Sequence, residues 1–243
     1  MTVTEQLPAV GRRHLLGISI SAAGVIALSA CGSPQPKPSS SGRGARSEEE
    51  VPVTPPEDLM REHGVLKRIL LIYREGIRRL QVGDQAPAQA LNAGAGIIRS
   101  FIEDYHEQLE ERYVFPKLEQ GGKLTDVTAV LRTQHQRGRV LTDRVLAATS
   151  GAAAPDQPAR EALVQDMSAF IRMYEPHEAR EDTVVFPALR DVVPAKDFRD
   201  LAEMFEDEEH RRFGRAGFQG VVDKVADIEK GLGIYDLSQF TAT

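Results

Sequence analysis

The sequence has few of the residues that build disulfides or metal–sulfur clusters. It has one cysteine, no tryptophan and six histidines among 243 residues. A single cysteine excludes an intramolecular disulfide framework and any cysteine-based zinc or iron–sulfur cluster. No charge of one sign dominates, because 30 basic and 36 acidic residues leave a net charge of −6. This mixture lacks the basic footprint of nucleic-acid binding, so we expect no nucleic-acid partner.

The composition is nevertheless that of a folded protein. Hydrophobic residues make up 41% of the chain, which is enough to bury a core and excludes wholesale disorder. The length allows one ordinary domain with extensions, or two small domains.

The first 31 residues have the organisation of an export signal. Arg12 and Arg13 precede an apolar run of 16 residues over 15–30, shorter than the roughly 20 residues of a membrane-spanning helix. The Arg-Arg-His-Leu-Leu string resembles a twin-arginine signal, although an arginine pair also suits the general secretory route. Leu-Ser-Ala-Cys, ending at Cys31, resembles a bacterial lipobox. We therefore expect a signal peptide over 1–31, lipidation of Cys31, and anchoring to the extracytoplasmic side of a bacterial membrane.

Residues 32–56 differ in composition from everything that follows. Pro, Ser or Gly occupy 14 of these 25 positions. Such a segment cannot bury enough apolar surface to order itself. We interpret it as a disordered tether between the anchor and the folded domain.

The rest of the chain is patterned as helices. Apolar residues recur at steps of three and four, the spacing of helices in a bundle. This spacing predicts an all-α fold, with a four-helix bundle over 57–192 and a helical extension over 193–243. The expected helices span residues 57–82, 87–119, 126–148, 156–192, 195–213 and 218–230.

Two of the predicted helices carry the same motif. Each motif is a histidine with a glutamate four residues later and a Phe-Pro pair after nine: His106, Glu110, Phe115 and Pro116 in the first, and His177, Glu181, Phe186 and Pro187 in the second. A lone histidine precedes each motif by 43 or 42 residues, namely His63 and His135. This duplication, with a period of about 72 residues, indicates a pseudo-twofold bundle. We interpret the Phe-Pro pairs as bundle-end packing and helix termination.

These spacings suit a metal centre. Residues four apart lie on one face of a helix, so each motif presents an imidazole and a carboxylate together. Two inward carboxylates could bridge two cations, and without cations they would be costly to bury. Imidazole and carboxylate suit iron, manganese or zinc, and helix-bundle precedent favours two irons. A single buried histidine is usually a core residue, but the duplication argues against that interpretation here.

The array resembles the hemerythrin-like, or HHE cation-binding, domain over residues 57–190. The resemblance implies an antiparallel, up-down four-helix bundle around an oxo- or hydroxo-bridged non-haem di-iron centre. It implies terminal ligands at four histidines and bridging ligands at two glutamates: His63, His106, His135 and His177, with Glu110 and Glu181.

Two departures from the oxygen-carrying hemerythrins weaken the interpretation as a reversible oxygen carrier. Those proteins have a second histidine on the third helix, where this sequence has Arg139. They also have an aspartate five residues after the fourth-helix histidine, where this sequence has Glu181 at four residues. Six protein ligands for two irons leave positions open to other ligands.

Other residues are candidates for completing the site. Glu206 and His210 form an i,i+4 pair on the helix expected over 195–213, as an additional ligand, an outer partner or a solvated face. Tyr105 and Tyr174 are candidates for a hydrogen-bonding or oxidisable tyrosine beside the metal, with core packing as the alternative.

The sequence leaves three functions open. The first is a redox-active di-iron protein that binds or consumes dioxygen, peroxide or nitric oxide. The second is iron storage or trafficking, although Tyr174 stands where a second ferritin-like Glu-x-x-His motif needs glutamate. The third is a metal-free helical interaction module. Turnover and oligomeric state are not decided by the sequence.

Overall fold

The computed structural model describes residues 53–83, 87–151 and 156–242, which all belong to one compact unit. The secondary structure of these residues is entirely helical, with no β-strand among them. The predicted all-helical fold class is therefore confirmed. The export signal over 1–31, including Cys31, and the tether up to residue 52 lie outside the described residues.

Four long helical runs come first along the chain, and a C-terminal pair of helices follows. The first run is α1 (Pro55–Gln81), and the third is α5 (Thr125–Thr149). The second run joins α2 (Ala88–Ile97), η1 (Ile98–His106), α3 (Glu107–Leu109), η2 (Glu110–Val114) and α4 (Phe115–Gln120). The fourth joins α6 (Gln157–Arg180), η3 (Glu181–Val185) and α7 (Phe186–Val192). The pair is α8 (Ala195–Phe213) and α9 (Gly217–Leu232), with the short turns η4 (Gly214–Ala216) and η5 (Leu237–Phe240). Segments η1, η2 and η3 are π-helical.

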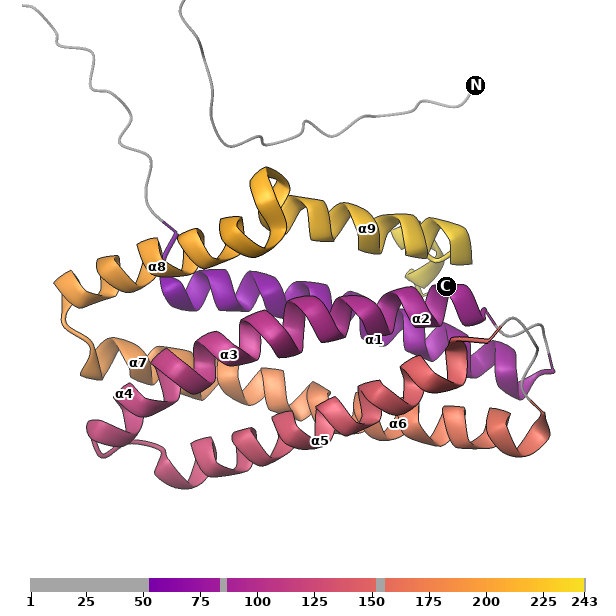
Figure 1. Ribbon diagram of the computed structural model, residues 1–243, viewed down its shortest axis with the longest axis horizontal. Helices are drawn as coiled ribbons and strands as arrows, with labels where there is room; N and C mark the ends of the chain where they lie inside the picture. Colours follow the sequence, from indigo (N-terminus) through magenta and orange to yellow (C-terminus); the bar gives the residue numbers. More distant parts are fainter. Residues whose placement is uncertain (1–52, 84–86, 152–155, 243) are drawn as a thin grey trace, which may run out of the picture. The chain divides into compact units, whose positions relative to one another are not determined.

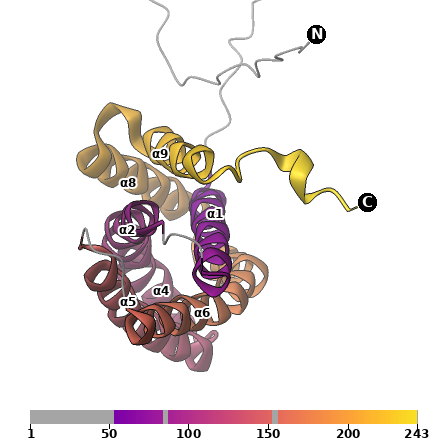
Figure 2. The same ribbon diagram turned by 90° about the vertical axis from the view of Figure 1, so that its right-hand side faces the viewer.

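The four runs pack side by side. Helix α1 contacts α2 and α6, and α5 contacts the same two helices. Successive runs point in opposite directions along the long axis (Figure 1). Helices α8 and α9 lie against α1 and α2, on the opposite side of the bundle from α5 and α6 (Figure 2). The core thus lies between the four runs, and the extension covers one of their faces.

The start of α1 follows from its cap. Glu57 donates its backbone N–H to Thr54 Oγ1 at 3.4 Å, and Thr54 donates its own to Glu57 Oε2 at 3.5 Å. Prolines are tolerated in the first turn, where backbone N–H groups have no helical partner. The helix therefore begins at Pro55, two residues before the predicted start. Pro176 lies inside α6 and does not end it.

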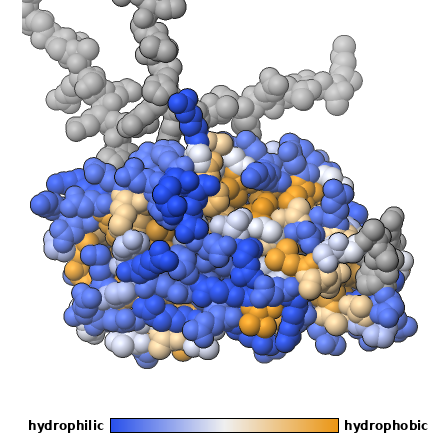
Figure 3. Space-filling view, in the orientation of Figure 1, coloured by the Kyte–Doolittle hydropathy of each residue, from blue (hydrophilic) through white to orange (hydrophobic). Residues whose placement is uncertain are grey.

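The surface of the described unit is mixed. The face in Figure 3 is largely hydrophilic, with apolar residues scattered among polar ones. Among the described residues, every helix is too short or too polar to span a bilayer.

Candidate metal centre

All six predicted ligands lie in the middle of the bundle. The four histidines come from α1, η1, α5 and α6, and the two glutamates begin the π-helical segments η2 and η3. Each side chain is at most 4% exposed: His63, His106, Glu110, His135, His177 and Glu181. Four helical runs thus bring together residues up to 118 positions apart in the sequence.

The Nε2 atoms of the histidines face the two carboxylates. Glu110 lies between two imidazoles, with Oε1 at 3.5 Å from His106 Nε2 and Oε2 at 3.5 Å from His135 Nε2. Glu181 Oε2 lies 3.4 Å from His63 Nε2 and 3.1 Å from His177 Nε2. Each carboxylate therefore contacts one histidine from each half of the duplicated sequence. This is the arrangement expected of two carboxylates shared by two cations.

The carboxylates fit a bound metal better than an empty core. All four oxygens of Glu110 and Glu181 are buried without a hydrogen bond. Burial and then the charge of Glu181 raise the pKa of Glu110 well above its usual range. Burial also opposes ionisation of Glu181, but the imidazoles of His177 and His63 hold its pKa well below its usual range. Buried carboxylate oxygens without hydrogen bonds cost free energy, and cations between them and the imidazoles would offset that cost.

The outward nitrogen of every histidine has a partner. The Nδ1 contacts are 2.7 Å from His63 to Asp182, 2.7 Å from His106 to Glu62, 2.9 Å from His135 to Glu111, and 2.8 Å from His177 to Gln134. An acceptor at Nδ1 holds the proton there and leaves the Nε2 lone pair free to bind a metal. The outer partners therefore orient all four imidazoles toward the same point.

These partners repeat with the motif, although the sequence analysis missed them. Glu62 and Gln134 each come directly before a histidine of the lone-histidine helices, and Glu111 and Asp182 each come directly after a central glutamate. Each partner stands next to the corresponding ligand in both halves of the sequence, and this repetition could have identified the four partners. The duplication therefore covers the outer contacts as well as the predicted ligands.

The Phe-Pro pairs belong to the site, so their interpretation as bundle-end packing and helix termination was wrong. Phe115 stacks on His135 with ring centroids 5.8 Å apart, and Phe186 stacks on His63 at 5.5 Å. The helices continue through Pro116 and Pro187 as α4 and α7. A proline lacks the N–H of a regular helix, and a π-helical turn precedes each one. The π-helical turns begin at the two central glutamates.

The two candidate tyrosines lie on different sides of the centre. Tyr174 donates its hydroxyl to Glu107 Oε1 at 2.7 Å, and its ring lies 5.2 Å from the His177 ring. Tyr105 is fully buried beside Glu62, the carboxylate that contacts His106 Nδ1. Both tyrosines lie next to residues that hold or form the centre.

His210 and Glu206 do not reach the centre. Both side chains are solvent-exposed on α8, and neither joins a group of metal-ligating side chains in the described part of the chain. The reason is the rotation of α8, whose neighbouring Glu209 points toward the bundle instead and is 6% exposed. The alternative of a solvated helix face therefore describes them.

Comparison with known proteins agrees with this geometry. The family model described as the hemerythrin HHE cation binding domain matches residues 54–189 and again 126–217. The chain belongs to the hemerythrin HHE cation-binding family. It is 77% identical over 243 residues to uncharacterized protein Mb2018 of Mycobacterium bovis and to uncharacterized proteins MT2051 and Rv1995 of Mycobacterium tuberculosis, covering 99% of this chain and 95% of each relative. No solved structure matches the chain.

Arg139 is one of the two departures from the oxygen-carrying hemerythrins, and the structure shows its contacts. Arg139 Nη2 lies 2.8 Å from Glu107 Oε2 and 2.8 Å from Glu111 Oε1. Glu111 in turn contacts His135. Arg139 is therefore a cation that holds an outer partner of the centre, and a guanidinium does not act as a metal ligand.

Proposed function

We propose that this hemerythrin-family protein holds a non-haem di-iron centre and interacts there with dioxygen, peroxide or nitric oxide. The observation that carries the proposal is the convergence of four Nε2 nitrogens on two buried carboxylates without hydrogen bonds. The direction of the four runs supports the antiparallel, up-down bundle of the family as part of the same proposal.

The donor set is compatible with iron. Nitrogen and oxygen ligands suit iron, manganese and zinc, and the dinuclear carboxylate–histidine sites of helix bundles favour iron. His63 and His106 would bind on one side, and His135 and His177 on the other, with Glu110 and Glu181 shared. A bound iron pair would supply redox chemistry toward small oxidants. The chain itself orients the imidazoles and excludes bulk water through the aromatic rings around them.

The two alternatives have less support. Iron storage of the ferritin type needs a glutamate where Tyr174 stands, and the Tyr174 hydroxyl instead donates to Glu107. A metal-free module would leave the buried oxygens of Glu110 and Glu181 without hydrogen bonds. Because a fold tolerates few such groups, the metal-binding function is the one that this interior favours.

We also propose export and lipid anchoring, on the sequence pattern alone. The arginine pair, the short apolar run and Cys31 support this proposal. Cys31→Ser should abolish incorporation of labelled fatty acid in a bacterial host. Replacing Arg12 and Arg13 with lysines should trap the precursor inside if the route is twin-arginine. Unchanged labelling or export would refute the corresponding step.

Metal analysis with absorption spectroscopy tests the central proposal. Protein purified from iron-replete cells should contain two irons per chain and absorb in the near ultraviolet, with a spectral change on adding peroxide. Glu181→Gln should lose the iron, whereas Glu161→Gln, an exposed glutamate of α6, should keep it. Wild-type protein without iron under these conditions would overturn the proposal.

A further inference from the structure

Tyr174 lies against one of the inner ligands of the candidate metal centre. Its ring centroid is 5.2 Å from that of His177, which follows it on α6. The side chain is 1% exposed, so the phenol is shielded from water. An electron that leaves this ring therefore has a single imidazole to cross before it reaches the position of a bound metal.

The Tyr174 hydroxyl already has a proton acceptor. It donates to Glu107 Oε1 at 2.7 Å, and Arg139 Nη2 lies 2.8 Å from the other oxygen of the same carboxylate. A phenol gives up an electron easily only when its proton leaves in the same step, and protons move readily between groups at hydrogen-bond distance. The structure thus supplies Tyr174 with an acceptor that a second side chain keeps in position.

The packing around Tyr174 leaves room for this contact. A Cβ at Gly138 would collide with the Tyr174 hydroxyl, so the absence of a side chain on α5 makes the space. The tyrosine also occurs in only one half of the duplication, because Glu103 stands three residues before His106 where Tyr174 stands three residues before His177. Since His106 is placed without a tyrosine, orienting a ligand does not explain Tyr174.

Tyr73 provides an internal comparison. It belongs to the same row of rings, because Phe170 contacts both tyrosines, Tyr73 at 5.7 Å and Tyr174 at 4.3 Å between ring centroids. Both phenols are buried to the same degree. The Tyr73 hydroxyl, however, makes no hydrogen bond, so its proton has no acceptor. Oxidation within this row should therefore stop at Tyr174.

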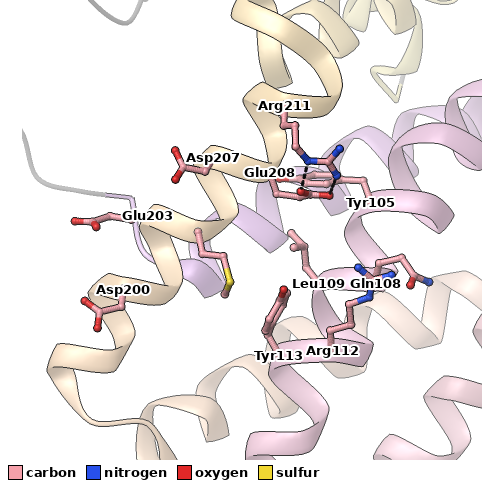
Figure 4. A pocket seen from close by; sticks show the side chains of 11 residues that line it. Tyr105, Gln108, Leu109, Arg112, Tyr113, Asp200, Glu203, Asp207, Glu208 and Arg211 are labelled. Carbon is pink, nitrogen blue, oxygen red and sulfur yellow. Dashed lines mark hydrogen bonds and ion pairs between the residues drawn. The ribbon is translucent and has the colours of Figure 1, made fainter.

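Tyr105 lies in different surroundings. Its ring contacts Phe101 and Phe213, and it lines a pocket of about 420 Å³ together with residues of α8. Figure 4 shows this pocket between Tyr105 and α8. Among the residues that the structure describes, Tyr174 is thus the tyrosine whose ring contacts a ligand histidine.

We propose that Tyr174 is an internal electron donor to the metal centre, with Glu107 as the acceptor of its proton. This role rests on the di-iron function proposed above, with hydrogen peroxide as the oxidant. When the iron pair can give only one electron, Tyr174 supplies the second. Its O–H bond breaks, the proton passes to Glu107 and the electron to the centre, and a neutral tyrosyl radical remains. The O–O bond of the peroxide breaks, and the two electrons with two protons from solvent make two molecules of water.

Electron paramagnetic resonance tests the proposal on the full, iron-loaded chain. Protein with a one-electron-reduced iron pair is mixed with hydrogen peroxide and frozen within seconds. The expected product is a tyrosyl radical, whose spectrum narrows when the protein carries ring-deuterated tyrosine. Wild type, the matched control Tyr73→Phe and Tyr105→Phe should form the radical, and Tyr174→Phe should not. An equal signal in Tyr174→Phe, or a signal lost in Tyr105→Phe instead, would overturn the proposal.

Iron content separates this role from the di-iron proposal. Wild type that holds iron and changes its spectrum with peroxide, yet forms no radical, would overturn the electron-donor role alone, whereas protein without iron would overturn both. Glu107→Gln is the second variant, in case Tyr174→Phe loses its iron. Glutamine keeps an oxygen acceptor for the Tyr174 hydroxyl but cannot take the proton, so the radical should form about 100-fold more slowly. An unchanged rate of radical formation would overturn the proposal.

Discussion

Replacing Glu110 with glutamine should have opposite effects on the metal-free and metal-loaded protein. Glu110 is fully buried, and neither of its oxygens makes a hydrogen bond. Burial and the nearby Glu181 charge raise its pKa well above its usual range. The metal-free fold therefore disfavours an ionised group at this position. Glu110→Gln removes that charge while keeping the size of the side chain, and its amide can donate to His106 or His135.

The size of the expected stability change follows from the burial of Glu110. A buried polar group without a partner costs about 1–3 kcal/mol, so the metal-free variant should gain about 2 kcal/mol at pH 7. For a domain of this size, that gain raises Tm by about 4–8 °C. Metal at a hundredfold excess over Kd adds about 2.7 kcal/mol per site to wild type. The variant should lose most of this stabilisation, because Glu110 is shared by both halves of the centre.

Thermal unfolding with chelator and with added iron measures both effects, and Glu161→Gln serves as the exposed control. The pH dependence of the stability difference between variant and wild type tests the direction of the Glu110 pKa shift. The pKa of Glu110 is raised in the folded protein, so its carboxylate destabilises the fold more as pH rises. This destabilisation is absent below about pH 4, where the carboxyl is protonated in both the folded and the unfolded protein. The gain from glutamine should therefore vanish in acid. A metal-free variant less stable than wild type at pH 7, or one still stabilised by iron, would refute this reasoning.

Three further predictions concern neighbouring residues. Gly138→Ala should destabilise the fold by about 1–3 kcal/mol in chemical denaturation, because a Cβ at this position collides with the Tyr174 ring and hydroxyl; Gly96→Ala, with open space at its Cβ, is the control. Metal binding at pH 7 should release protons, and the affinity for metal should rise with pH up to about pH 9. Burial lowers the pKa of His63, but contacts with Asp182 and Glu181 outweigh burial and raise this pKa to about 9. A metal that binds His63 must therefore displace its proton. Calorimetry in buffers of different ionisation enthalpy measures this release, and no release would contradict the prediction. Asp182→Ala should weaken metal binding by about 10–100-fold, because His63 loses its Nδ1 partner; unchanged affinity in a competition assay with a chelator would count against that role.

The helices and the inner ligand positions were predictable from the sequence because both depend on short-range periodicity. A stripe at steps of three and four defines a helix, and His106 and Glu110 lie on one face of it whatever surrounds them. The structure brings together the six residues that the duplication selected. That they bind metal remains a prediction.

The outer contacts were not predictable in the same way, because each joins two helices. The pairing of His63 with Asp182 spans 119 positions, and that of His106 with Glu62 spans 44. Their partners depend on how neighbouring helices are rotated, which hydrophobic periodicity does not specify finely enough. The same limit explains His210: the i,i+4 pairing with Glu206 is real on the helix, but α8 turns that face to solvent and Glu209 toward the bundle.

The two halves of the centre are equal in their inner ligands and unequal in their outer partners. His106 is held by the carboxylate of Glu62, and His177 by the amide of Gln134. A carboxylate at Nδ1 makes an imidazole a stronger donor than an amide does. Two metal positions with the same ligand set would therefore differ in metal affinity and in reduction potential.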